Sequence, residues 1–442
     1  MTTRWPAPAD STAEGRTPPL LSRRPAQFLA LAAVAIAVPL IWWVTSTIVR
    51  GGNNYNDFHD FYLAAKLIVQ GHSPYDKQAL AALADSQGLH FVVGTGYSYP
   101  LPFAIAMIPF TALSFTAAAL AFNGLSLLAF GLTAAAWIGW AHGWSPETLR
   151  RRVAVAAAAG LYPSVYGTIA NGQAGLILLP LLGLGTIAAL DPTRGSRRLL
   201  GGVGIGLAAI VKLTPGILVV PLALGRQFRA AAGIGLGALG ALAIATLLAP
   251  WAGEGSAGLT SLLEPDSYFT NQSLNGVISR VVLPSERTLP LWSHAFDPRP
   301  AAFVVTVAFG LLTLWVLWRA RSSLDGRRGL ALGLGLALVA GLIGAPKGTY
   351  WNQCLLLIPA GLLLAVEVPD LDIRRLGRFD LALGGFWLLG TWIQTLLWFF
   401  PPPKFGAFAP AVTILTSASI YGLLAFWLLF ARRLLRSTIP DA

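Results

Sequence analysis

Long apolar stretches recur along nearly the whole chain, and short polar segments separate them. An α-helix needs roughly 20 apolar residues to cross the hydrocarbon core of a membrane, and most of the stretches approach that length. The pattern therefore predicts an all-α polytopic membrane protein with about twelve spanning helices. The predicted spans are residues 27–49, 114–141, 153–169, 172–190, 199–212, 214–224, 229–250, 301–319, 329–345, 350–366, 379–400 and 408–431.

Some parts of this pattern depart from a regular span. Residues 99–113 are apolar but short, and we expect them to form either a half-inserted hairpin or a thirteenth helix. The spans 199–212 and 214–224 are also short; they meet at Lys212, and Pro215 breaks the backbone soon after. Glycine-rich runs such as "GIGLGALGAL" are expected to let neighbouring helices approach closely.

Composition supports the membrane interpretation. Hydrophobic residues make up 55% of the chain and charged residues 11%, whereas soluble domains carry about 25% charged residues. Cys354 is the single cysteine, so no intrachain disulfide can form. The sequence has no Walker-type phosphate loop, no Rossmann glycine fingerprint and no zinc-spaced His or Cys cluster, and its outer acidic residues are scattered. We therefore expect neither a cofactor nor a metal.

The basic residues follow the positive-inside rule, in which loops rich in Lys and Arg face the cytoplasm. With a cytoplasmic N-terminus and twelve crossings, 22 of the 31 basic residues, all of them Arg, fall in the inward-facing segments. The net charge of +12 is therefore explained by topology and not by a nucleic-acid-binding surface. The inward-facing segments are residues 1–26, 142–152, 191–198, 225–229, 319–328, 367–378 and 432–442.

This topology defines the expected domain organisation. Residues 1–26 read as a disordered cytoplasmic tail, residues 27–436 as a single transmembrane domain, and residues 437–442 as the cytoplasmic tail end. The protein is expected to be a multi-pass protein of the plasma (inner) membrane. Two long loops, 50–98 and 251–300, face outward, and we expect any chemistry on that extracytoplasmic side.

The first outer loop contains "NNYNDFHDFYLAAKLIVQGHSPYD", residues 53–76. Aromatic and apolar residues recur at helical spacing, and Gly71 and Pro74 end the run. The stretch predicts a helix that lies along the outer membrane face with its aromatic side toward the lipid. Asp57 would be the helix N-cap, with Asp60 in the first turn. The same position would also fix the direction of a catalytic carboxylate.

Five motifs follow one another along the chain: "DFHDFYLAAKLIVQGHSPYD", "YSYPLPFAIAMIPF", "NGQAGLILLPLLGLG", "IVKLTPGILVVPLAL" and "NQSLNGVISR". In order and spacing they resemble glycosyltransferase family 87, over roughly residues 30–430. The resemblance implies a GT-C type fold with interfacial helices and an active site on the outer face. It also implies a polyprenyl-phosphate sugar, often mannose, as donor. It places the catalytic base on Asp57, with Asp60 as the second candidate.

The implied reaction needs a carboxylate and a cation. One carboxylate can deprotonate the acceptor hydroxyl as it attacks the anomeric carbon with inversion. Positive charge near the headgroups can stabilise the departing lipid phosphate. The candidates for binding the donor phosphate are Lys212, Arg280, Lys347 and His59. The candidates for binding the sugar or the acceptor are Tyr62, Tyr99, Gln173, Asn271, Gln272, Tyr350 and Asn352.

One stretch departs from the family pattern. In "APKGTYWNQCLLLIP", Asn352 and Gln353 stand where members of the family often have histidines, and Lys347 is a candidate replacement for the missing cation. This leaves the sugar open among mannose, a pentose, glucose and galactose. The expected partners are the polyprenyl-phosphate sugar donor, a lipid or glycan acceptor and membrane lipids, with no nucleic acid.

Plainer interpretations remain open beside the catalytic one. Lys212 could be a snorkelling lysine near a helix end, His59 an interfacial residue without a role, and residues 271–280 a solvated loop. The alternative for the whole protein is a lipid-linked sugar flippase or a secondary transporter. Against it, the polar residues gather on one side, and Asp380 is nearly the only acidic residue in a span. A catalytically inactive relative that only binds lipid-linked sugar is a further alternative.

Overall fold

The computed structural model describes residues 56–89, 96–142, 157–253, 264–285, 287–292, 296–368, 375–400 and 409–438, together with most of residues 35–49. Within that part the regular structure is helical, and the one extended pairing is an isolated bridge between Asn271 and Thr349. The predicted tail at 1–26 and most of the predicted tail end lie outside the described residues, so the structure does not test these predictions.

Six helical segments of the described part are long and apolar enough to cross a membrane. Three shorter apolar helices accompany them: Ala37–Val49, α8 (Gly175–Ala189) and the continuous pair η3 (Thr214–Leu218) and α10 (Val219–Leu224). The chain is therefore a polytopic membrane protein, while the total of twelve spans stays a prediction. The six long segments are α5 (Phe115–His142), α11 (Phe228–Leu248), α14 (Pro298–Arg319), the pair η6 (Tyr350–Leu356) and α16 (Leu357–Glu367), α17 (Arg378–Phe399) and α19 (Ala418–Arg436).

The irregular apolar stretches form broken helices. α9 (Gly195–Val211) is capped at its C-terminus by Lys212, whose extended backbone leads into η3. Pro215 lies in the first turn of η3. The predicted span 408–431 is divided between α18 (Ala409–Leu415) and α19. Residues 99–113 form α4 (Leu101–Ala106) and η1 (Ile108–Ala112), which are each too short to cross a membrane. A thirteenth spanning helix is therefore wrong, because Met107 separates the stretch into two short pieces.

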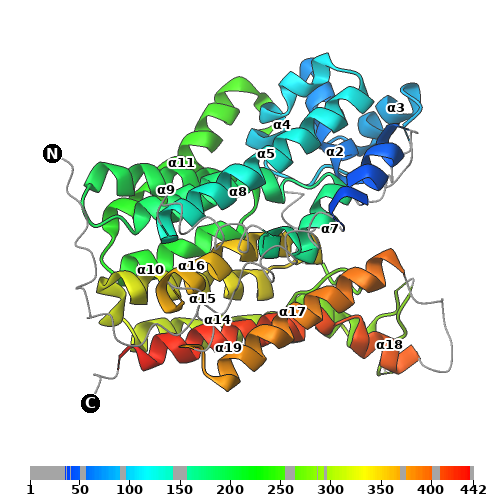
Figure 1. The fold of residues 1–442 in the computed structure, drawn as a ribbon. Coiled ribbons are helices and arrows are strands. Elements are labelled where there is room, and N and C mark those ends of the chain that lie inside the picture. The colour runs from blue at the N-terminus through cyan, green and yellow to red at the C-terminus, as the bar shows by residue number, and fades with distance from the viewer. Residues whose placement is uncertain are drawn as a thin grey trace.

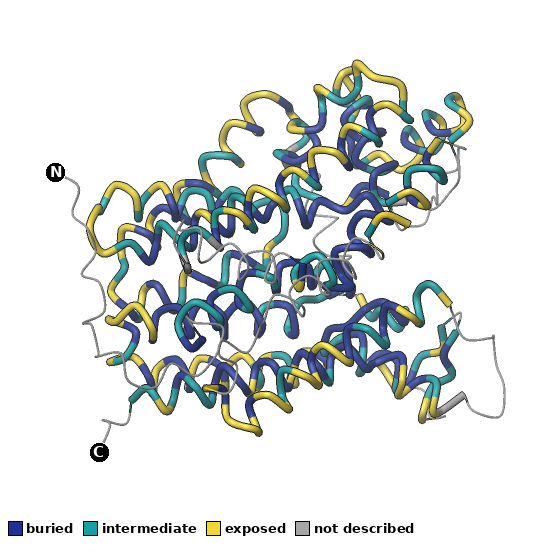
Figure 2. Tube along the Cα trace, viewed as in Figure 1, coloured by how far each residue is buried: buried dark blue, intermediate teal, exposed yellow. Residues whose placement is uncertain are grey.

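The core lies where the helices face one another. α15 (Arg327–Ile343) buries almost every residue from Gly329 to Ile343, as expected for a helix that is apolar all round. Figure 2 shows buried residues along the facing sides of the helices and exposed residues along their outer sides. The exposed sides of α11 and α14 are rich in large apolar residues, such as Leu247 and Phe303, which are 86% and 70% exposed. These sides suit contact with lipid tails.

Glycines allow α9 and α11 to pack closely, as the glycine-rich run predicted. A Cβ atom built on Gly202 would lie 2.0 Å from Ala230 O, and one on Gly206 would lie 2.2 Å from Ile234 O. The glycines of α11 divide by face. Gly237 meets Val203 O at 2.3 Å, whereas Gly240 has no atom within 4 Å. Close approach of α11 to α9 is therefore confined to one side of α11, while α9 also approaches α8 closely, since a Cβ atom on Gly201 would lie 2.6 Å from Gly185 O.

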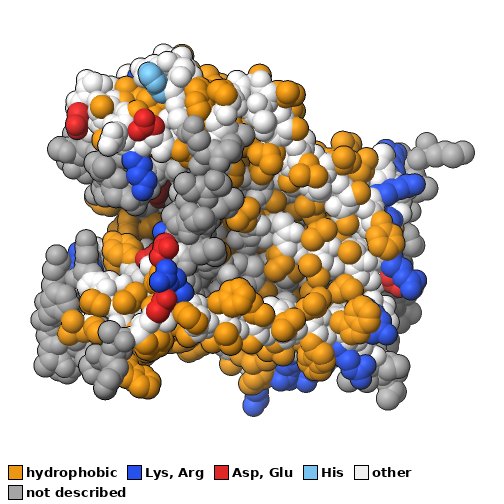
Figure 3. All heavy atoms as spheres, turned by 180° about the vertical axis from the view of Figure 1, so that it is seen from behind, with side chains coloured by type: hydrophobic (Ala, Val, Ile, Leu, Met, Phe, Trp, Pro, Cys, Tyr) orange, Lys and Arg blue, Asp and Glu red, His pale blue; other side chains and the backbone are white. Residues whose placement is uncertain are grey.

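Among the described residues, segments that were predicted to face the cytoplasm contact one another in pairs. Arg198 Nη1 donates a 2.8 Å hydrogen bond to Gln227 Oε1. In η5 (Ser323–Asp325), Ser323 Oγ donates to Ser437 O at 3.0 Å. Figure 3 shows Lys and Arg side chains at one end of the molecule, while the opposite end is notched between two lobes. The alternation of inner and outer loops, and which end faces the cytoplasm, stay predictions.

An ion-pair network ties four helices together at the arginine-rich end. Arg433 of α19 contacts Glu367 of α16 at 3.0 Å and Asp380 of α17 at 2.5 Å. Arg328 of α15 contacts Glu367 at 2.7 Å, and Arg432 contacts Asp380 at 3.3 Å. Asp380, the acidic residue that a transporter pathway would have needed, is therefore paired with two arginines.

The other end, which we call the α2 end, carries the helix predicted from residues 53–76. It is α2 (Asn56–Val69), and α3 (Lys77–Ser86) and α4 lie beside it (Figure 1). The expectation that its aromatic side faces the lipid is wrong. Phe58, Phe61 and Tyr62 are 0% exposed. Phe58 and Phe61 both pack on Phe122 of α5, with ring centroids 5.0 and 6.3 Å apart. The aromatic face thus docks α2 onto the protein.

Candidate active site

The docked helix α2 fixes the position of Asp57. This residue lies in the first turn of α2. Its Oδ2 accepts a 2.5 Å hydrogen bond from Nε2 of Gln173, 116 positions away in the chain. The expected N-cap role is therefore replaced by a contact with a distant segment. The burial of neighbouring Phe58 and Phe61 leaves the helix little freedom to move this carboxylate.

Gln173 lies in a tight turn between two helices. α7 (Pro163–Asn171) ends at Gly172, which adopts the left-handed conformation with φ of 63°. Glycine adopts this conformation without strain, so the chain can reverse there and α8 can begin two residues after Gln173. The Gln173 side chain is directed into the protein and is only 5% exposed.

Lys212 reaches the same amide from the break after α9. Its Nζ donates to Gln173 Oε1 at 3.0 Å and also to Oδ1 of Asn352 in η6. Tyr99, which precedes α4, donates its hydroxyl to Gln173 Oε1 at 2.8 Å. The Lys212 ammonium also lies 5.7 Å from the centroid of the Tyr99 ring, within the range of a cation–π contact.

These five residues form one hydrogen-bonded group, which we call the polar cluster. The cluster joins α2, the segment before α4, the α7–α8 turn, the end of α9 and η6. All five were candidates from the sequence, and the structure brings them together from five separate segments. The residues of the polar cluster are Asp57, Tyr99, Gln173, Lys212 and Asn352.

Burial and neighbouring charges give the two aspartates of α2 different pKa values. Burial raises the pKa of Asp57 to about 6, although the hydrogen bond from Gln173 and the charge of Lys212 both act to lower it. Burial and the nearby charge of Asp57 raise the pKa of Asp60 to about 8. Near neutral pH, Asp57 is therefore mostly ionised and Asp60 is mostly protonated. Burial also raises the pKa of Tyr99 above its usual range, so its hydroxyl remains a hydrogen-bond donor.

Arg280, Asn271 and Gln272 lie outside the polar cluster and hold the protein together. Arg280 of α13 (Leu274–Val282) is 0% exposed and donates to Asn271 O at 2.7 Å, to Tyr268 O at 3.0 Å and to Ser417 Oγ at 3.1 Å. Asn271 Oδ1 accepts from Gly348 N at 3.0 Å. Gln272 is also 0% exposed. The donors of Arg280 are therefore engaged by the protein itself.

Gln272 and Tyr350 are likewise structural in this arrangement. Gln272 Nε2 donates to the carbonyls of Phe269 and Thr416 at 2.7 and 2.6 Å. Tyr350 is 0% exposed, and a Cβ atom on Gly167 would lie 2.7 Å from its hydroxyl oxygen. This tight packing of η6 on α7 leaves no room for a sugar beside that hydroxyl.

The other candidates also lie away from the polar cluster. His59 is buried and stacks on Phe115, with ring centroids 4.3 Å apart. Tyr62 donates its hydroxyl to Leu113 O at 2.8 Å. Lys347 is exposed to solvent.

One supporting residue was missed by the sequence analysis. Thr168 of α7 donates its hydroxyl to Trp351 O at 2.9 Å and so holds η6, which carries Asn352, against α7. Nothing in the sequence pairs residues 183 positions apart, so no sequence signal would have found this contact.

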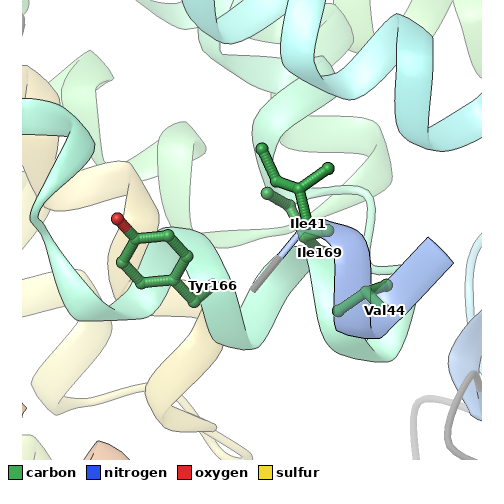
Figure 4. A pocket seen from close by; sticks show the side chains of 4 residues that line it. All are labelled: Ile41, Val44, Tyr166 and Ile169. Atoms are coloured by element: carbon green, nitrogen blue, oxygen red, sulfur yellow. The ribbon is translucent and has the colours of Figure 1, made fainter. Parts of the chain in front are cut away.

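Two further features help to place the site. Between the helix Ala37–Val49 and α7 lies a small apolar pocket, lined by Ile41, Val44, Tyr166 and Ile169 (Figure 4). It has no charged side chain for catalysis. Among the described residues, no group of three His, Cys, Asp or Glu side chains is placed to hold a metal ion. The polar cluster, which brings together a carboxylate, an ammonium, a phenol and two amides, is the candidate active site.

Comparison with known proteins identifies the family. No curated protein matches the chain. The family model of glycosyltransferase family 87 matches residues 97–346, which is more than half of the 442 residues. The matched region contains Tyr99, Gln173 and Lys212, while Asp57 and Asn352 lie outside it. The chain belongs to glycosyltransferase family 87 and, with its membrane-spanning helices, is a membrane glycosyltransferase.

Proposed function

We propose that the protein transfers a sugar from a polyprenyl-phosphate donor to a hydroxyl of a lipid or glycan acceptor, with inversion, on the outer face of the plasma membrane. The polar cluster carries the proposal. In it a half-buried carboxylate and a half-buried ammonium are joined through one amide at the α2 end. The base and the cation that such a transfer requires are therefore hydrogen-bonded to the same side chain, that of Gln173.

Asp57 is the better base of the two aspartates. A general base must be ionised at the working pH, and it works best when its pKa lies near that pH. The pKa of Asp57, about 6, meets both conditions. Asp60, with a pKa of about 8, is mostly protonated near neutral pH. The hydrogen bond from Gln173 also directs the Asp57 carboxylate toward the rest of the cluster.

Lys212 is the better cation of the four phosphate-binding candidates. Its ammonium donates to the neutral amide oxygens of Gln173 and Asn352, and no ion pair joins it to a carboxylate in the described residues. Its charge is therefore available to an anion. The donors of Arg280 are engaged, Lys347 is exposed, and His59 is stacked on a phenylalanine.

The reaction then balances in charge and protons. The acceptor oxygen forms a bond to the anomeric carbon as its proton passes to Asp57, and the bond from that carbon to the phosphate oxygen breaks. The donor phosphodiester carries one negative charge, and the departing lipid monophosphate carries up to two. Lys212 faces this added charge, so it stabilises the transition state more than the ground state.

Mannose is the first sugar to test, because the donors used by the family are often mannosyl lipids. The pairing of Asp380 with Arg432 and Arg433 weighs against a transporter, which would need that acidic residue for its pathway.

The test uses purified protein in lipid vesicles and a panel of polyprenyl-phosphate sugars. Loss of sugar from the donor is followed for the wild type, Asp57→Asn and Asp60→Asn. Asp85→Asn, on the exposed surface of α3, serves as the matched control. We expect one donor to be consumed, and Asp57→Asn to lower its turnover by about 10²–10⁴-fold. Asp60→Asn and Asp85→Asn should stay near wild type.

Two results would contradict the proposal. If Asp60→Asn loses turnover while Asp57→Asn retains it, the catalytic base is Asp60, one helical turn further along α2. Movement of a labelled donor across the membrane, without consumption of any donor, would favour the flippase.

A further inference from the structure

We propose that Gln173 is a positioning residue whose amide holds the Asp57 carboxylate and the Lys212 ammonium apart, so that the two charges do not collapse into a direct ion pair. The inference rests on the proposed function, because it assigns Gln173 to the support of the base and the cation. It replaces the expectation that this side chain binds the sugar or the acceptor.

The hydrogen bonds define the orientation of the amide. Nε2 donates to Asp57, and Oε1 accepts from both Lys212 and Tyr99. In the flipped orientation the NH₂ group would face an ammonium and a hydroxyl donor, and the oxygen would face a carboxylate. The Tyr99 hydroxyl could turn to accept from the NH₂ group, but the contacts with the ammonium and the carboxylate would both be repulsive, so the amide has one favourable orientation.

The surroundings prevent the side chain from leaving this position. Gln173 is 5% exposed, and its backbone N–H donates to Thr168 O at 2.9 Å. Asn171, two residues before it, donates its Nδ2 to Gly167 O at 2.8 Å. A side chain held by its own backbone and by three polar partners is poorly placed to reorganise around a substrate.

Separation of the two charges serves the chemistry. A direct contact between Asp57 and Lys212 in this buried site would be strong, because little water screens it. It would lower the proton affinity of the base and use the positive charge that the phosphate needs. With the amide between them, each charge keeps a hydrogen-bond partner while both stay available to ligands.

A single-atom exchange tests this role. Gln173→Glu keeps the size of the side chain but replaces the donating NH₂ group with oxygen. The new carboxylate would pair with Lys212 and repel Asp57. We therefore expect about a 100-fold loss of kcat and a shift of the acid limb of the pH–rate profile upward by about one pH unit. The titratable groups that interact with Asp57 are Asp60, Tyr99 and Lys212, and Cys354 interacts in turn with Tyr99 and Lys212.

Two other variants separate this role from simpler ones. Gln173→Met keeps the length and removes all three side-chain hydrogen bonds, so kcat should fall without recovery at high pH. Gln78→Glu, on the exposed side of α3, adds the same charge outside the polar cluster and should leave the pH–rate profile unchanged. A sugar-binding role would instead raise KM in both Gln173 variants and leave the acid limb in place, and that result would overturn the inference.

A measurement without turnover keeps the inference distinct from the proposed function. Infrared titration of the protein in lipid reports the protonated carboxyl band that is lost in Asp57→Asn. We expect this band to titrate at higher pH in Gln173→Glu than in the wild type. If no donor is consumed but the band shifts, the proposed function fails and the positioning role stands. If the donor is consumed but neither the band nor the acid limb shifts, the positioning role fails alone.

Discussion

Lys212 and Asn352 are joined by a side-chain hydrogen bond although 140 positions separate them in the chain. Asn352 stands where the family pattern often has a histidine, and the sequence suggested Lys347 as the replacement cation. The structure places Lys347 on the exposed surface and the amide of Asn352 against Lys212. Gln353, the second departure, accepts instead from Ser419 Oγ at 2.8 Å.

The activity of the wild type should rise with pH through about 6. Asp57 acts as a base only when ionised, and burial raises its pKa to about 6. Initial rates of donor consumption between about pH 4.5 and 8 measure this limb. Asp60→Asn should keep the limb near the same pH, because Asp60 is already protonated there. A limb that moves to about 4 would mean that the base is an ordinary exposed carboxylate.

Replacement of Asp60 should stabilise the protein at alkaline pH. The folded protein holds the proton of Asp60 up to about pH 8, whereas an aspartate in the unfolded chain, with its ordinary pKa of 3.8, releases the proton at lower pH. Folding stability therefore falls as pH rises between these values, and Asp60→Asn removes that loss. We expect a gain of about 2 °C or more in Tm at about pH 9 and little change at about pH 4. An equal gain at both pH values would rule out this cause.

Removal of the Lys212 charge should weaken use of the donor. Lys212→Met should lower kcat/KM for the lipid-phosphate donor by about 100-fold. Negative charge builds up on the departing phosphate in the transition state of the transfer, and the variant removes the cation that stabilises it. Asn352→Asp should have a similar effect by pairing Lys212 with a carboxylate. Steady-state kinetics against donor concentration measure both. Lys347→Met should stay within about twofold of wild type, and a larger effect there than at Lys212 would reverse the assignment.

Replacement of Arg280 should affect folding before catalysis. Arg280→Met would leave the carbonyls of Tyr268 and Asn271 without their guanidinium partner and should lower the free energy of unfolding by about 3 kcal/mol. Arg280→Lys should recover only part of this loss, because one ammonium cannot reproduce the forked contacts. Thermal unfolding in detergent measures both variants. If the variants keep normal stability but lose affinity for the donor, Arg280 binds the donor phosphate, as the sequence suggested.

The glycine contact between α9 and α11 offers a matched pair of variants. Gly202→Ala places a methyl group against Ala230 O and should destabilise the protein by about 1–3 kcal/mol. Gly240→Ala, where space is open, should be neutral or slightly stabilising. Thermal unfolding of both in the same detergent gives the comparison. Equal losses would show that helix flexibility, not close packing, explains the glycines.

The sequence by itself determined the helical, membrane-spanning class and the candidate residues of the polar cluster. Long apolar runs can satisfy their backbone hydrogen bonds in lipid only as helices or closed barrels, and their length and composition favour helices. The breaks at Lys212 and Pro215 were also local, because proline interrupts a helix wherever it stands. Asp57 and Lys212 were recognisable as charged residues beside apolar runs, whereas Gln173 became a candidate through the resemblance to the family.

Only the tertiary structure decided which of these residues meet. The aromatic side of α2 packs on α5 and not on lipid, since helical periodicity records an apolar face but not its partner. For the same reason Arg280, which is similar in sequence context to Lys212, is enclosed by carbonyls while Lys212 faces two amides. Contacts across more than a hundred positions depend on how helices pack, and packing depends on side-chain shapes that a one-dimensional pattern does not contain.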